Sequence, residues 1–228
     1  MHLENMVTML LFFAGIIIVI YAQSKINNSY RKSSKIKIKN GLSGVEVARK
    51  ILDSNNLSNI HVVSVGGTLT DHYDPSRKVV RLSNDVFNND SIAAISVAAH
   101  ECGHAIQDKV GYSFMKIRSM LVPIVNFVTY IGYIVSIISL FAGITGYLKV
   151  GIMLIIVSLI FQLVTLPVEF DASKRAIEEL NKLGLIEKEE NQNVKEMLSA
   201  AAFTYVASFI SSILNLLRLV IMLGNRDE

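Results

Sequence analysis

The protein has 228 residues, of which 51% are hydrophobic, and its mean hydropathy is +0.44. This composition is too apolar for an ordinary soluble globular protein, and the length allows one domain with membrane spans rather than two sizeable soluble domains. The net charge of +3 comes without a basic stripe interleaved with aromatic residues, which excludes a nucleic-acid-binding class. The single cysteine, Cys102, excludes an internal disulfide.

The first 24 residues are predicted to be a membrane anchor. Met6 to Ala22 is an uncharged apolar run that is just long enough to cross a bilayer. A cleaved signal peptide is the alternative, but no Lys or Arg precedes the run and no small-residue cleavage site follows it. The residues that follow include six with basic side chains: Lys25, Arg31, Lys32, Lys35, Lys37 and Lys39. By the positive-inside rule, this basic flank lies in the cytoplasm.

Residues 25–118 are predicted to form a small cytoplasmic α+β unit. Ser43 to Leu52 has the apolar spacing of a short helix and opens with an S-x-x-E capping box. Asn59 to Val65 and Lys78 to Leu82 have the composition of strands, and glycine and proline turn signals lie between them. A second, longer helix is expected from Ile92 through Gln107.

The rest of the chain is predicted to be mostly membrane helix. Two apolar stretches within residues 119–168 are separated only by Lys149, which predicts a transmembrane hairpin with its turn at that lysine. Residues 169–198 are polar and helical. Residues 199–228 contain a fourth apolar block, which either spans the membrane or packs as an amphipathic helix, and we favour a span. The expected fold class is therefore a mainly α membrane protein, with about four transmembrane helices and a small zincin-like α+β unit.

An H-E-x-x-H motif begins at His100 and indicates a zinc site on the longer helix. His100 and His104 are four residues apart, so they share one helix face and can bind a single ion. Glu101 lies beside them and can act as general base toward a zinc-bound water. Gly103 costs about 1 kcal/mol relative to alanine inside a helix, which makes sense if something must approach the helix closely. The alternatives are a surface helix with incidental histidines and a closed structural zinc site.

A catalytic zinc usually has three protein ligands, so a third ligand must come from elsewhere in the chain. Glu169 is favoured, because it follows the return span of the hairpin and so comes back to the membrane level at which the helix after His104 ends. Its other interpretation is an interfacial carboxylate that marks the end of a span. The remaining candidates are His61, His72, Asp171, Glu178 and Glu179.

Five motifs together resemble the YugP-type neutral zinc metallopeptidases of bacteria over nearly the whole chain. They are Asp71-His72-Tyr73-Asp74-Pro75, Val80-Arg81-Leu82-Ser83, the segment from Ala98 to Gln107, the segment from Pro167 to Ser173, and the segment from Ala201 to Ala207. A more distant similarity is to the HtpX and CAAX prenyl protease group, in which H-E-x-x-H is followed by a membrane segment and then by E-x-x-x-D.

The resemblance implies one zinc ion per chain, held by His100, His104 and Glu169, with Glu101 as the catalytic base. Ser173 stands where the distant pattern has an aspartate. Helical spacing places Ser173 on the face of Glu169, whereas Asp171 points nearly opposite, so we expect Asp171 to be a poor substitute for a carboxylate that orients a ligand histidine.

Weaker expectations concern the groups around the zinc. Tyr205 and Arg175 are candidate donors to an oxyanion. Cys102 is expected to pack in the interior and to bind nothing. A substrate backbone could lie along an exposed strand edge just before the zinc helix. The residues proposed for that edge are Val79, Val80, Arg81 and Leu82.

The predicted function is that of a membrane-embedded zinc metalloendopeptidase that hydrolyses peptide bonds near the cytoplasmic surface of a bacterial cell membrane. Its expected partners are the lipid bilayer and a peptide or membrane-protein substrate, and no nucleic acid. The alternative is a non-catalytic metal-binding assembly factor or transporter. Glu101 distinguishes the two, because a structural or transport site would not require a base at that position.

Overall fold

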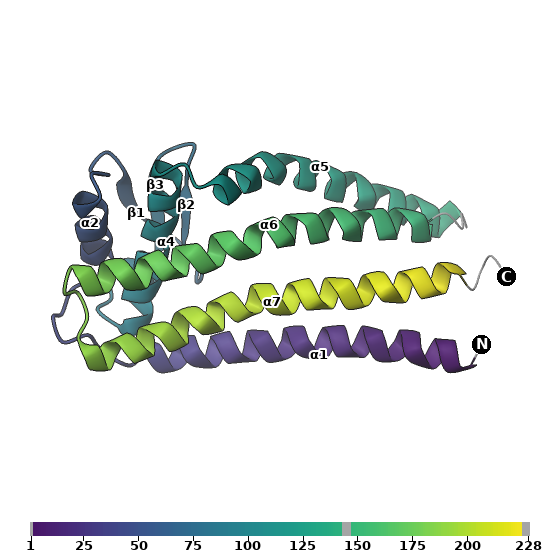
Figure 1. Ribbon diagram of the computed structural model, residues 1–228, viewed down its shortest axis with the longest axis horizontal. Coiled ribbons are helices and arrows are strands. Elements are labelled where there is room, and N and C mark those ends of the chain that lie inside the picture. Colours follow the sequence, from purple (N-terminus) through teal and green to yellow (C-terminus); the bar gives the residue numbers. More distant parts are fainter. Residues whose placement is uncertain (1, 143–146, 225–228) are drawn as a thin grey trace. The chain divides into compact units, whose positions relative to one another are not determined.

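A computed structural model of the protein describes residues 2–142 and 147–224, which are mainly helical and include one small sheet (Figure 1). The chain divides into two compact units. The apolar unit comprises Met1–Gln23, Lys116–Leu166 and Thr204–Glu228, and the polar unit comprises Ser24–Met115 and Pro167–Phe203.

Among the described residues, four helices are long and apolar enough to cross a membrane, as expected. They are α1 (His2–Ser33), α5 (Ser113–Ala142), α6 (Tyr147–Lys182) and α7 (Lys188–Gly224). Each contains a long uncharged segment whose apolar side chains are not confined to one narrow stripe. This pattern is typical of helices surrounded by lipid. The prediction of a mainly α membrane protein with a small α+β unit is confirmed. The fourth apolar block lies within α7 and meets the length of a span.

The predicted break of the hairpin at Lys149 is wrong. Lys149 lies inside α6, which begins at Tyr147, and α5 ends at Ala142. The intervening residues 143–146 are outside the described part of the chain. A lysine in the first turn of a helix keeps its ammonium group near the helix end, so its charge does not require a break there. The helix α6 then continues past Pro167, where the chain passes from the apolar to the polar unit.

The polar unit contains helices α2 (Gly44–Ser54), α3 (Asn84–Phe87) and α4 (Ile92–Lys109). The predicted capping box at the start of α2 is present, because the Ser43 N–H donates to the Glu46 carboxylate at 2.8 Å. The start of α4 is capped by Ser91, whose hydroxyl accepts a hydrogen bond from the Ala94 N–H. Local hydrogen bonds of this kind define where both helices begin.

The sheet of the polar unit has three strands in the order β1-β3-β2, comprising β1 (His61–Val65), β2 (His72–Asp74) and β3 (Val79–Ser83). β1 and β3 are the two predicted strands, and they pair in parallel. β2 was not predicted as a strand, because it is only three residues long. It pairs antiparallel with β3 over Val79 to Arg81.

This order contradicts the expectation that Val79, Val80, Arg81 and Leu82 form an exposed strand edge. β3 is the central strand, and its backbone pairs with β1 along its whole length and with β2 over three residues. Val79, Val80 and Leu82 are buried. The error arises because a short apolar run predicts a buried strand but does not specify its neighbours. A substrate backbone cannot pair with β3 over the stretch that β2 already occupies.

Helix α4 lies at the centre of the polar unit. It packs against α2, α3, β2 and β3, and most of its side chains are buried (Figure 1). Its apolar residues join those of α2 and β3 in one hydrophobic core, which includes Ile51, Leu82 and Ile95. Burial on several sides explains why the apolar residues of α4 do not form a single stripe. The polar residues of the H-E-x-x-H motif therefore lie in a largely buried helix.

Candidate metal centre

The structure brings together three potential metal ligands from two helices. His100 and His104 lie on α4 and Glu169 lies on α6, and one ligand atom from each lies within 4.8 Å of the others. The Glu169 Oε2 atom is 3.3 Å from His100 Nε2 and 3.8 Å from His104 Nε2. Within the described residues, no other group of His, Cys, Asp or Glu side chains meets this criterion.

Gly103 explains how α6 approaches α4 closely enough for Glu169 to reach the histidines. A Cβ atom at this position would lie 2.5 Å from the backbone oxygen of Ala172. Real Cβ atoms do not come so close to backbone oxygens, so any other residue would push the two helices apart. The expectation that the glycine allows a close approach is confirmed, and the approaching element is the helix that carries Glu169.

Both histidines are held with the same ring nitrogen toward Glu169. The Nδ1 atom of His104 is 3.0 Å from Gln107 Oε1, and the Nδ1 atom of His100 is 3.2 Å from Ser173 Oγ. An amide oxygen can only accept a hydrogen bond, so Gln107 favours the tautomer of His104 in which Nε2 is free to bind a metal. Ser173 was a predicted candidate for such a contact, and it lies on the face of Glu169 as helical spacing indicates.

These three groups fit a zinc ion. Neutral imidazole nitrogens and a carboxylate oxygen are ordinary zinc ligands, and around one tetrahedral ion such atoms lie roughly 3–3.6 Å apart. The observed separation of 3.3 Å between His100 and Glu169 falls in this range, and the 3.8 Å between His104 and Glu169 is slightly longer. Three protein ligands also leave a position for substrate or water, as catalytic zinc sites do.

Gln107 is the residue of the site that the sequence analysis missed. Its side chain is fully buried, and its Nε2 donates to Val168 O at 2.7 Å and to Asp171 Oδ2 at 2.9 Å. Asp171 also accepts a hydrogen bond from Arg175 Nε at 2.6 Å. Asp171 therefore affects His104 through Gln107, because it fixes which way the amide faces. The signal available in the sequence was a glutamine three residues after His104 on a predicted helix, because residues three apart are neighbours on a helix surface.

Gln107→Leu should weaken zinc binding and lower peptidase activity by roughly 10- to 100-fold, because the orientation of His104 is lost. Gln107→Glu should also weaken zinc binding, because its second oxygen would face Val168 O and the Asp171 carboxylate, to which the amide nitrogen now donates. Zinc affinity is measured by competition with a chelator. Ser96→Ala is the matched control, because Ser96 is also a fully buried polar residue of α4, and its hydroxyl donates to Ile92 O within the same helix. Equal zinc affinities in Gln107→Leu and Ser96→Ala would contradict this role.

Glu101, the predicted base, lies beside the ligands in a buried position. One of its oxygens accepts a hydrogen bond from the Tyr73 N–H on β2 at 2.9 Å. Burial, which is the largest effect, raises the pKa of Glu101 to about 7, and the nearby charge of His100 opposes this shift. Glu169 and Asp71 raise the pKa further because they are also carboxylates. The unpredicted strand β2 thus supplies the hydrogen bond that orients the carboxylate.

The other predicted residues differ in where the structure places them. Arg175 donates a hydrogen bond from its Nε to the Asp171 carboxylate, a contact that holds Asp171 in place. Tyr205 lies on α7 in the apolar unit and is 37% exposed, and its role as an oxyanion donor stays a prediction. Cys102 is a buried free thiol whose Sγ lies 3.6 Å from Ala48 O, in agreement with a packing role.

The candidate metal site consists of Glu169 and two histidines of one buried helix, and the described residues include four helices apolar enough to span a membrane. This combination indicates the class of membrane metallopeptidases. The chain belongs to the family described as "Putative neutral zinc metallopeptidase", which it matches over residues 8–224. It is also 43% identical over 224 residues to the "Putative membrane protease YugP" of Bacillus subtilis (strain 168), an alignment that covers 98% of this chain and 100% of the relative. No solved structure matches the chain significantly.

Proposed function

We propose that the protein is a zinc metalloendopeptidase with one catalytic zinc ion per chain, held by His100, His104 and Glu169. The observation that carries this proposal is the position of Glu101, which lies on the same buried helix as two ligands and is oriented by the Tyr73 N–H. A site that only stored or transported metal would have no need for a buried, oriented carboxylate outside its ligand set.

In the proposed mechanism, the Glu101 carboxylate accepts a proton from the attacking water and later delivers it to the leaving nitrogen of the cleaved peptide bond. Zinc, when bound, supplies a Lewis acid that polarises the scissile carbonyl and lowers the pKa of a water molecule. Gln107 and Ser173 hold His104 and His100 in fixed orientations, so the ligands need no rearrangement during the reaction.

We further propose that the protein lies in the bacterial cell membrane as a multi-pass protein with its active site on the cytoplasmic side. The basic flank between Lys25 and Lys39 supports this orientation by the positive-inside rule. Glu169 follows the apolar segment of α6 almost directly in the sequence, which favours a site close to the membrane surface. Membrane proteins and chains that emerge from the bilayer are then the expected substrates.

The purified protein in liposomes should cleave a membrane-anchored reporter peptide, and a chelator such as 1,10-phenanthroline should abolish cleavage. Added Zn²⁺ should restore it, because the two histidines and Glu169 form an open site that exchanges metal. Cleavage is measured by mass spectrometry of the products, beside soluble unfolded casein at the same concentration. Cleavage that persists without metal contradicts the mechanism. Equal rates for casein and the anchored peptide contradict the proposed preference for membrane substrates.

A further inference from the structure

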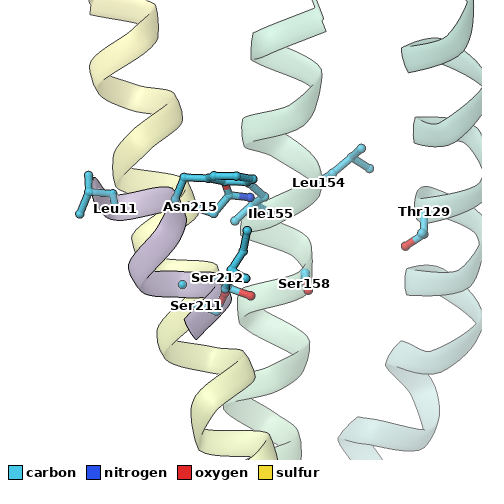
Figure 2. A pocket seen from close by; sticks show the side chains of 11 residues that line it. Leu11, Thr129, Leu154, Ile155, Ser158, Ser211, Ser212 and Asn215 are labelled. Atoms are coloured by element: carbon cyan, nitrogen blue, oxygen red, sulfur yellow. The ribbon is translucent and has the colours of Figure 1, made fainter. Parts of the chain in front are cut away.

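The apolar unit contains a cavity of about 440 Å³ between segments of α1, α5, α6 and α7 (Figure 2). Most of its wall is apolar, with Leu11, Leu154 and Ile155 among the lining residues. Five of its lining side chains carry a hydroxyl or an amide group: Thr129, Ser158, Ser211, Ser212 and Asn215. Phe12 and Ile16 also line it and are 41% and 38% exposed, so the cavity opens to the outer surface of this unit.

Arg218 is not itself a lining residue of this cavity, but it contacts two residues that are. Its Cζ atom is 4.6 Å from the centre of the Phe12 ring, and its Nη1 donates to Asn215 Oδ1 at 3.4 Å. Asn215 is one turn before Arg218 on α7, so the guanidinium is directed back along the helix and away from its end at Gly224. The charge is therefore turned toward the cavity instead of extending past the helix end.

Among the residues that the structure describes, no carboxylate lies within ion-pair distance of Arg218. A charged side chain in a membrane-spanning segment is costly unless it has a partner, and such residues commonly mark a functional site. Phe12 and Asn215 reduce this cost only in part, because neither carries a negative charge. A negatively charged group beside Arg218 would offset the rest of this cost.

The shape and lining of the cavity indicate what kind of anion could enter. Its volume lies in the range of roughly 300–1,000 Å³ that is typical of small-molecule sites, and such sites are mostly apolar with a few polar groups. A hydrocarbon chain matches the apolar wall. An acidic group at its end matches Arg218 and Asn215, while the serine hydroxyls can donate to ester oxygens. A transmembrane helix of another protein would require an extended face rather than a cavity of this size.

We propose that this cavity binds one anionic lipid, with its phosphate or carboxylate on Arg218 and its hydrocarbon chain between the helices. Among the polar lining residues of α7, Ser211 lies against Gly15 of α1, and Ser212 accepts a hydrogen bond from Gln162 of α6 (Figure 2). Asn215 accepts the hydrogen bond from Arg218, and these three groups would contact the polar end of the lipid. The site lies apart from the catalytic residues in the sequence and contains none of them, so the inference does not depend on the proposed peptidase activity.

The test is native mass spectrometry of the full-length protein in detergent, titrated with phosphatidylglycerol, with phosphatidylcholine of the same acyl chains, and with oleate. The wild type should hold one phosphatidylglycerol or oleate per chain in preference to phosphatidylcholine. Arg218→Gln should weaken binding of the anionic lipid by about tenfold or more, since charge-assisted hydrogen bonds are lost. The arms with phosphatidylglycerol and oleate distinguish a phosphate from a carboxylate as the preferred acidic group.

Two further variants test separately whether the position of the charge and the volume of the cavity matter for lipid binding. Lys149→Gln removes the same charge from the exposed start of α6 outside the cavity, and it should change lipid affinity less than twofold. Ile155→Phe should fill the cavity and weaken binding of every lipid, with the positive charge retained. Equal losses in Arg218→Gln and Lys149→Gln, or unchanged binding in Ile155→Phe, would overturn the proposal. So would equally tight binding of glycerol 3-phosphate, because that result would exclude a role for the hydrocarbon chain.

Discussion

Glu101→Gln is expected to abolish peptide hydrolysis while zinc stays bound. Glutamine has nearly the shape of glutamate and can still accept the hydrogen bond from the Tyr73 N–H, so the fold around the site should be retained. It cannot accept a proton from water at neutral pH. General base catalysis contributes about 10²- to 10⁴-fold to rates of this kind, and we expect a loss of at least that size. The measurements are the cleavage rate of the membrane-anchored reporter and the zinc content of the same sample.

Glu179→Gln is the matched control for this variant. Glu179 is another buried glutamate, but it lies farther along α6, where it accepts a hydrogen bond from Asn55 and pairs with Lys182. Its replacement should leave the cleavage rate unchanged within a few-fold. If Glu101→Gln keeps wild-type activity with a full complement of zinc, the base is another group. Glu101 would then no longer distinguish the proposed enzyme from a non-catalytic metal-binding protein.

Glu169→Ala is expected to lower zinc affinity by more than about 100-fold, because it removes one of three ligands and not merely a supporting contact. The zinc content after dialysis against a weak chelator should fall well below one ion per chain. Activity should fall with it and should recover in part at high zinc concentration. The affinity is read from metal analysis by mass spectrometry across a series of chelator concentrations, and thermal unfolding of the same sample reports whether the fold is retained.

Glu178→Ala provides the comparison for the third ligand. Glu178 lies on the same helix and is exposed beside Lys174, and it was one of the alternative ligands that the sequence allowed. Its loss should leave zinc binding unchanged. Tightly held zinc in Glu169→Ala would move the third ligand to another residue. A loss in both variants would point to a general effect on α6 and not to coordination by Glu169.

Much of the zinc site was predictable because its signals are local. Residues four apart on a helix share a face, which is enough to pair His100 with His104 whatever surrounds them. Glu169 required one more step, namely that the chain returns to the same level after two spans. The glycine between the histidines also indicated a close approach, and Ala172 is the residue that approaches.

The contacts that orient these groups were not predictable in the same way. Gln107 meets His104 within one helix, but its amide is fixed by Val168 and Asp171, which are about sixty residues away in the sequence. The strand β2 is three residues long and has no periodicity to detect, yet its Tyr73 N–H holds Glu101. The central place of β3 depends on which strands pair with it.

The sequence by itself determined the class of the fold, the four apolar helices, the H-E-x-x-H helix and its pair of candidate ligand histidines, because hydropathy and helical spacing act over short stretches of chain. Only the tertiary structure decided how the histidines are oriented, which backbone group holds Glu101 and where Arg218 directs its charge. Each of these depends on hydrogen bonds or packing between elements that are distant in the sequence, and no local pattern specifies such partners.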